Sequence, residues 1–154
     1  MFDTPDASFD SSVPRIKQLS VFLENRVGAL LSVTRSLEAL GLRISALSII
    51  DSVDHSVARL VVDRSELAYE TLRADGYSVV ESELLGVIIP EDHALGIRGL
   101  LSTLLLAELN VHYLYPLLTT SMGPPVLAVH VEDADAGERV LREKGYELVG
   151  QDEL

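Results

Sequence analysis

Two short polar segments hold the residues whose types and spacing could bind a small charged ligand. Residues 24–30 are Glu-Asn-Arg-Val-Gly-Ala-Leu and residues 91–97 are Glu-Asp-His-Ala-Leu-Gly-Ile, and apolar residues at helical spacing follow each. Gly28 and Gly96 would therefore stand at helix starts, where unpaired N–H groups attract an anion and glycine allows close approach. The Asn25 amide oxygen and the Asp92 carboxylate could accept hydrogen bonds from an ammonium group. Alternatively, these two residues only cap the loop-to-helix junctions.

The two segments belong to an internal repeat. The helical stripes that follow them match at an offset of 67 residues. These stripes are Leu30, Val33, Leu37 and Leu40 in the first copy and Ile97, Leu100, Leu104 and Ala107 in the second. Further along, Leu72-Gly76-Tyr77 matches Leu141-Gly145-Tyr146 at an offset of 69, so the second copy gains two residues between its second and third strands. A repeat of about 70 residues indicates two small domains side by side.

Each copy has the same predicted order of strands and helices. The first copy is expected to contain strands at 17–23, 43–50, 57–62 and 77–80 and helices at 28–40 and 65–74. The second is expected to contain strands at 84–89, 111–118, 126–131 and 146–149 and helices at 96–108 and 134–144. This order predicts an α+β protein made of two ferredoxin-like βαββαβ units, each with an antiparallel sheet and both helices on one face. We expect a disordered tail at residues 1–15, a first domain at 16–82 and a second at 83–154.

The strands leave edges and apolar faces that need partners. The predicted sheet order 4-1-3-2 puts strands 2 and 4 of each unit at edges, and we expect strand 2 to pair with strand 2 into one eight-stranded sheet. Residues 84–89 and 126–129 are apolar on both faces, so two such sheets are expected to stack through their open faces into a homodimer. Leu101, Leu105 and Leu106 lie outside their helix's core stripe, which indicates either a fuller core or an oligomer interface.

The composition excludes several classes of function. The chain has 154 residues, 47% of them hydrophobic, and no cysteine, which rules out disulfides and thiolate sites and suits the cytoplasm. The polar, acidic residues 1–15 do not resemble a signal peptide, and the longest apolar stretch, residues 100–109, is about half a membrane span. The net charge of −12, with scattered cations, disfavours nucleic-acid binding. We therefore expect no membrane or nucleic-acid partner.

Other polar groups carry weaker signals. His55 lies in a turn with Asp51 and Asp54, where an exposed polar turn is a simpler interpretation than a metal site. Three further histidines share no metal-ligand spacing: His93, His112 and His130. Tyr113 and Tyr115 lie on one face of a predicted strand, and packing is favoured over a ligand contact. We expect no catalytic residue, no metal and no cofactor.

The first polar segment resembles the signature of ACT domains, the amino-acid-sensing modules of phosphoglycerate dehydrogenase, aspartate kinase and related enzymes. The family pattern is Asp/Asn-x-Pro-Gly-x-Leu into the first helix, then Gly-Ile/Val-Asn-Ile at the second strand. Residues 41–44, Gly-Leu-Arg-Ile, and residues 108–111, Glu-Leu-Asn-Val, stand at that strand here. Val27 replaces the usual Pro, and Ala94 and Leu95 replace the Pro and first Gly in the second copy. The resemblance covers about residues 17–150. The chain resembles in particular the stand-alone bacterial proteins made of two ACT domains.

The resemblance implies an amino-acid site at the interface between paired ACT domains. The implied ligand-binding residues are Asn25, Val27, Gly28, Ala29, Leu30, Arg43, Asp92, Leu95, Gly96 and Asn110. Serine specificity is not implied, because the strand-one histidine of serine-sensing domains is Leu23 in one copy and Pro90 in the other. With strand 2 paired to strand 2, Asn25 and Gly28 would face Asn110 and form the better pocket. Asp92 and Gly96 would face Arg43 in the other.

The sequence thus favours a non-enzymatic regulatory protein that binds an amino acid and acts on a regulated enzyme. The alternative is a structural or partner-binding ACT protein without a ligand. An enzyme is least favoured, since an acylphosphatase needs a glycine pattern around its loop arginine that Arg26 lacks. An RNA-binding domain of this topology needs exposed aromatics on its central strands, and Phe22 stands there alone in the first copy.

Overall fold

The elements follow the predicted order twice. The computed structural model of the chain describes residues 15–24, 27–91, 95–118 and 123–154. The first unit contains β1 (Ile16–Glu24), α1 (Ala29–Glu38), β2 (Ile44–Asp51), β3 (His55–Val62) and α2 (Ser65–Ala74). The strand β4 (Ser78–Ile88) leads into the second unit, which contains α3 (Ile97–Leu106), β5 (Val111–Pro116), β6 (Val126–Val131), α4 (Ala134–Lys144) and β7 (Leu148–Val149). The α+β class and the ferredoxin-like units are confirmed.

One strand, β4, serves both units. Its residues from Ser78 to Leu84 pair with β1, and its residues from Leu85 to Ile88 pair with β6. The alternation of side chains continues through this switch. Val79 and Leu85 face the helix-side cores of the first and second units, while Leu84 lies in the cluster between the units. The strand therefore fixes both units in one register and joins them without a linker.

The strand order corrects the predicted edge pairing. The order is β2-β3-β1-β4-β6-β5, with β7 on β4, so that each unit has the predicted 4-1-3-2 arrangement. The second strands of the two units, β2 and β5, lie at opposite ends of this sheet. The expectation that they pair edge to edge within the chain is wrong, because β4, the edge strand of the first unit, continues as an inner strand of the second unit and joins the units there.

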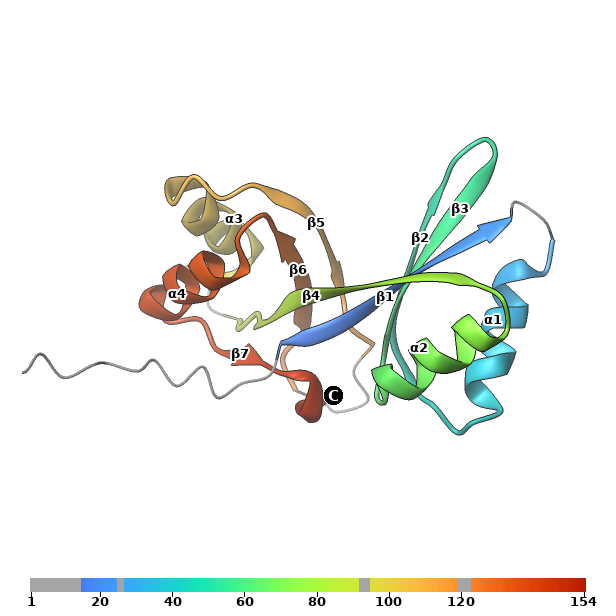
Figure 1. The fold of residues 1–154 in the computed structure, drawn as a ribbon. Coiled ribbons are helices and arrows are strands. Elements are labelled where there is room, and N and C mark those ends of the chain that lie inside the picture. Colours follow the sequence, from blue (N-terminus) through green and yellow to red (C-terminus); the bar gives the residue numbers. More distant parts are fainter. Residues whose placement is uncertain (1–14, 25–26, 92–94, 119–122) are drawn as a thin grey trace, which may run out of the picture.

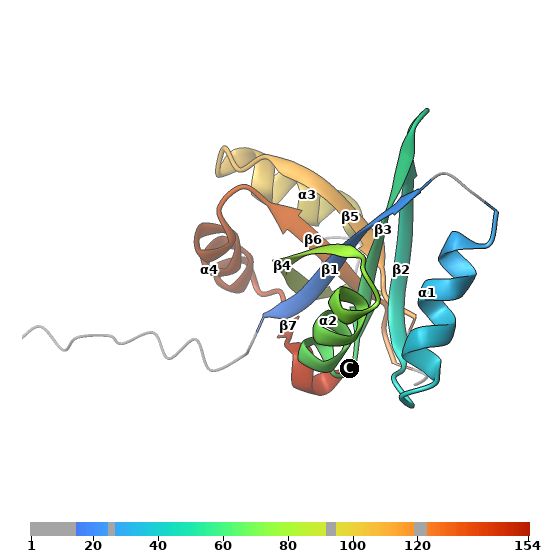
Figure 2. The same cartoon turned by 45° about the vertical axis from the view of Figure 1, so that its right-hand side comes forward.

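The two halves of the sheet pack on each other through the faces opposite their helices. Figures 1 and 2 show α1 and α2 outside one half, α3 and α4 outside the other, and the strands between them. The cluster between the halves consists of buried Ile16, Ala46, Val61, Leu84, Tyr115, Leu117, Val126 and Ala128. The apolar open faces thus cover each other inside one chain. This corrects the expected stacking of two chains through those faces.

The ends of the helices repeat between the units. Each α-helix that the structure describes ends in a backbone hydrogen bond from a residue just past the helix to the carbonyl five residues earlier, and the donors are Leu42, Tyr77, Leu109 and Tyr146. The residue before each donor has a positive φ angle. Three of these residues are glycines, and the fourth, Glu108, keeps a φ of 56° at the position that matches Gly41. The shared geometry overrides the side-chain type at this position.

Three leucines of α3 remain outside the core. The exposed fractions are 41% for Leu101, 75% for Leu105 and 85% for Leu106. The interpretation of a fuller core is therefore wrong for these residues. None of the helices that the structure describes has the length and apolar character needed to span a membrane.

Candidate functional site

The first loop-to-helix junction begins α1 with a glycine in the left-handed conformation. The helix α1 begins at Ala29, and Gly28 before it has a φ of 85° in the left-handed region, where glycine is favoured. Gly28 has no side chain that could cap the helix, and its carbonyl accepts the Ser32 N–H at 3.0 Å. The N–H groups of the first turn point out of the helix, so the positive end of its dipole is directed at whatever lies before Gly28.

This junction opens into a pocket of about 240 Å³. The pocket is lined by Leu23, Glu24, Gly28, Ala29, Leu30, Leu31, Ile49 and Ser56. All of these residues belong to the first unit, so the predicted pairing of Gly28 with Asn110 across a seam inside the chain is wrong. The prediction failed because it required β2 and β5 to pair edge to edge, and these strands lie at opposite ends of the sheet.

The second junction has a different geometry. Gly96 precedes α3 with φ −71° and ψ −172°, an extended conformation that any residue can adopt. Leu95 packs against the second unit's core, and the Tyr146 hydroxyl donates to the Gly96 carbonyl at 3.4 Å. The left-handed turn that aims the first helix start is absent at Gly96. The two copies of the loop are therefore not equivalent sites.

Arg43 and Asn110 occupy matching positions at the second strands. The Arg43 N–H donates to Asp63 Oδ1 at 3.0 Å, and the Asn110 N–H donates to Glu132 Oε1 at 3.1 Å. Both side chains are exposed. The predicted approach of Gly96 to Arg43 also depended on paired second strands, which the strand order contradicts, and Asp92 lies outside the described residues.

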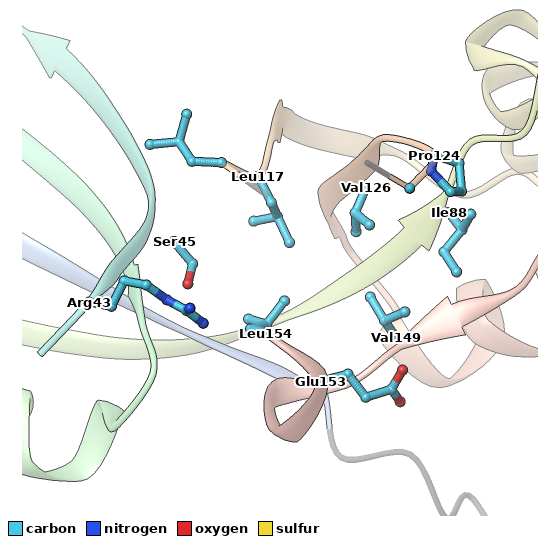
Figure 3. A pocket seen from close by; sticks show the side chains of 11 residues that line it. Arg43, Ser45, Ile88, Leu117, Pro124, Val126, Val149, Glu153 and Leu154 are labelled. Atoms are coloured by element: carbon cyan, nitrogen blue, oxygen red, sulfur yellow. The ribbon is translucent and has the colours of Figure 1, made fainter. Parts of the chain in front are cut away.

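A larger cavity, of about 440 Å³, lies between the two units. Figure 3 shows its lining: Arg43 and Ser45 come from the start of β2, and apolar side chains of the second unit form the opposite wall. Those side chains include Ile88, Leu117, Val126 and Val149. The Leu118 N–H donates to the Ser45 carbonyl at 2.6 Å and ties the two walls together.

A buried polar network crosses the same interface. Gln18 is fully buried, and its Nε2 donates to the Tyr113 hydroxyl at 2.7 Å and to Ser82 Oγ at 3.1 Å. The Tyr115 hydroxyl donates to Gln18 Oε1 at 2.5 Å, and burial raises the pKa of Tyr115. The Arg59 guanidinium lies 3.6 Å from the centre of the Tyr113 ring. These tyrosines therefore pack and hydrogen-bond between the units, as the sequence favoured.

Two histidines that spacing did not connect lie together. The Nδ1 atoms of His112 and His130 are 3.1 Å apart, and the His130 ring stacks on Tyr113. Burial, with His112 and Arg59 nearby, lowers the pKa of His130. A register shift between Val111 and Tyr113 brings the two imidazoles together. Within the part of the chain that the structure describes, no three His, Asp or Glu side chains gather as a metal site would require.

The geometry and the repeat agree with one known family. The family model of the ACT domain pair matches residues 14–154. The chain belongs to the ACT domain pair family. No curated protein sequence matches the chain.

Solved structures share the fold of this ACT domain pair. Protein BT0572 from Bacteroides thetaiotaomicron is 26% identical, with a TM-score of 0.83 over 92% of this chain and 96% of that one. The regulatory subunit of aspartate kinase from Thermus thermophilus is 13% identical, with a TM-score of 0.59 over 86% of this chain and 94% of that one. The corresponding subunit from Thermus flavus is 12% identical, with a TM-score of 0.58 over 84% and 92%. At these identities the two kinase subunits show the fold alone.

The residues that the ACT motif predicted as one kind of ligand site lie in two separate places in the structure. Gly28, Ala29 and Leu30 line the pocket at the first junction, whereas Arg43 lines the cavity between the units. Val27 lies fully exposed beside the first junction and does not line that pocket. Asn25 and Asp92 lie outside the described residues. Sequence reasoning missed Ile49 as a wall of the pocket and Gln18 as a link between the units. A polar residue inside the otherwise alternating β1 was the signal for Gln18.

Proposed function

We propose that this ACT domain pair is a regulatory, non-catalytic protein that binds a free amino acid in the pocket at Gly28. The observation that supports it most is the left-handed start of α1 at Gly28, because the residues of this helix start line an open pocket and the first N–H groups of a helix have no partner within it. The ligand carboxylate would bind at this helix start. Asn25, for which the ammonium contact stays a prediction, follows β1 directly.

The pocket suits a small amino acid. Its volume of about 240 Å³ is below the roughly 300–1,000 Å³ that is usual for drug-sized ligands. Leu30 and Ile49 offer apolar contacts for a side chain, and the Ser56 residue lies at the β3 end of the wall. Because the net charge is −12, a zwitterion would be repelled less than a free anion on approach.

A glutamate at the pocket wall tests this site. Leu31 is 51% exposed and lines the pocket in the first turn of α1, where a carboxylate is compatible with the helix dipole. Leu31→Glu is expected to keep the fold and to weaken amino-acid binding by about tenfold, because its carboxylate competes for the same donors. Thermal-shift screening of the twenty amino acids, followed by calorimetry, measures both effects.

The matched control is Leu105→Glu, which makes the same substitution at a 75% exposed residue of α3, outside the pocket lining. It should change the affinity by less than about threefold, since exposed charges are screened. If no amino acid binds the wild-type chain at millimolar concentration, a structural or partner-binding role without a ligand replaces this proposal. Equal losses in both variants would move the site away from the pocket.

We further propose a homodimer through the outer edge of β2. This strand ends the sheet and exposes Leu47, Ile49 and Ile50 at 40%, 48% and 45%. An apolar edge strand favours pairing with another strand. Since Ile49 also lines the Gly28 pocket, a second copy on this edge would border the bound ligand.

A lysine on that edge is expected to separate the dimer. Ile50→Lys places a charge on the exposed strand without removing a buried side chain. Light scattering should show twice 16.8 kDa for the wild type at micromolar concentration and 16.8 kDa for the variant. Leu106→Lys, on an exposed part of α3, is the control and should leave the mass doubled. A wild-type mass of one chain, or a doubled mass in Ile50→Lys, contradicts the β2 interface.

The regulated partner is proposed to be an enzyme, as is the case for the aspartate kinases whose regulatory subunits share this fold. We place the protein in the cytoplasm, as the sequence predicts. We also keep the proposed domain boundary at residue 82, two residues before Leu84, the last residue of β4 that pairs with β1.

A further inference from the structure

We propose that the cavity between the two units is a second ligand site, for an aliphatic monocarboxylate whose carboxylate binds Arg43. The cavity measures about 440 Å³, within the usual range for a small-molecule site. It shares no lining residue with the pocket at Gly28. The inference therefore does not depend on the proposed function.

Arg43 supplies the cationic end of this site. Figure 3 shows its guanidinium turned into the cavity beside Ser45 and Leu154. Asp63 holds the Arg43 backbone on both sides, since its Oδ1 accepts the Arg43 N–H at 3.0 Å and its own N–H donates to the Arg43 carbonyl at 3.2 Å. Among the described residues, no carboxylate forms an ion pair with the Arg43 side chain. An unpaired guanidinium fork on a fixed backbone matches a carboxylate.

The opposite wall suits an aliphatic chain. Leu117 and Val126 are 7% and 8% exposed, and Ile88 and Val149 are half-buried beside them. These side chains come from β4, from the segment after β5, and from β6 and β7, so the apolar wall is built by the second unit. A ligand with its carboxylate on Arg43 would extend its tail from the first unit onto the second. Burial of that tail supplies the non-directional part of the affinity.

The polar groups of the cavity favour an acid without an ammonium group. The Ser45 carbonyl already accepts the Leu118 N–H at 2.6 Å. Glu153 lines the cavity, but Figure 3 shows its carboxylate turned away from the Arg43 guanidinium. An ammonium group one carbon away from a carboxylate on Arg43 would thus meet only the neutral oxygens of Ser45, and it would lie close to the positive guanidinium. A monocarboxylate avoids this cost.

Three probes of one length separate the possibilities. Hexanoate, hexanamide and norleucine have the same chain and differ in the charge at one end. Each is titrated into the full chain while methyl NMR signals are followed. Hexanoate is expected to shift the methyl signals of Ile88, Val126 and Val149, and hexanamide to bind at least tenfold more weakly. Arg43→Met should weaken hexanoate at least tenfold, whereas Arg98→Met, which removes an exposed cation on α3, should not.

The outcomes decide between the two sites. Hexanoate shifts confined to Ile49 and Leu30, or equal hexanoate affinity in Arg43→Met and the wild type, would overturn the second site. Tighter binding of norleucine than of hexanoate at Ile88 and Val149 would overturn the monocarboxylate class. Failure of the Gly28 pocket appears separately, as a lack of amino-acid-induced shifts at Ile49 and Leu30.

Discussion

Gly86→Ala is expected to lower the free energy of unfolding by about 2–4 kcal/mol, because no side chain fits at this point of β4. A Cβ atom on Gly86 would lie 2.7 Å from the Val149 carbonyl oxygen and 2.5 Å from Ile16 Cδ1. The oxygen belongs to the backbone of β7, which pairs with β4 at this residue, so it cannot rotate away. Urea denaturation followed by circular dichroism measures the loss.

Gly137→Ala is the control for this prediction. Gly137 lies inside α4, and its added Cβ would meet only the ends of the Leu85 and Val131 side chains, at 3.1 Å. Those side chains can adjust by a few tenths of an ångström, and alanine favours the helix by about 1 kcal/mol over glycine. The two effects oppose each other, so we expect a change within about 1 kcal/mol. Equal losses at both positions would show that the close approach at Gly86 is not the cause.

Gln18→Leu is expected to cost about 1–3 kcal/mol, because it leaves the buried Tyr115 hydroxyl without its acceptor. Tyr115 is 8% exposed and donates only to Gln18 Oε1 among the described hydrogen bonds. The hydroxyl of Tyr113, which is half-buried, can turn to water more easily. The loss should therefore come mainly from Tyr115.

A double-mutant cycle isolates that contribution. In Gln18→Leu with Tyr115→Phe both partners are apolar, so the second substitution should recover much of the stability that the first removes. Tyr115→Phe alone should be destabilising, since it leaves the Gln18 amide oxygen without its described donor. Simple addition of the two single costs would contradict a direct bond between these groups across the interface.

The positions of most helices and strands were predictable because they depend on the apolar pattern and capping residues of short segments. The bounds of α2, β6 and α4 agree with the sequence-based expectation. The strand before residue 149 is shorter than expected. Its first expected residue, Tyr146, instead donates its N–H to the Leu141 carbonyl and completes the end of α4. A bond of this kind depends on backbone conformation, which the apolar pattern does not report.

The arrangement of the units was not predictable in the same way. The edge strand β2 and the apolar face of each half-sheet were both expected to pack against a partner. The sequence pattern does not determine which of these surfaces is covered within the chain. The answer depends on groups such as Gln18, Tyr113 and Tyr115, which are distant in sequence and complementary only after folding. For the same reason, Arg43 could be assigned to a ligand but not to the cavity between the units.

Because both units share β4, a shift in the pairing register of this strand would affect both units at once. Along β4, Val79 and Leu85 point toward the helices of successive units, while Leu84 points between the units. A slip of one residue would reverse these directions along the whole strand, so that both cores would lose their side chains together. Neither unit can therefore be replaced on its own by the corresponding unit of a related protein. Insertions within β4 are excluded for the same reason, whereas the turn between β5 and β6 has already accommodated two extra residues.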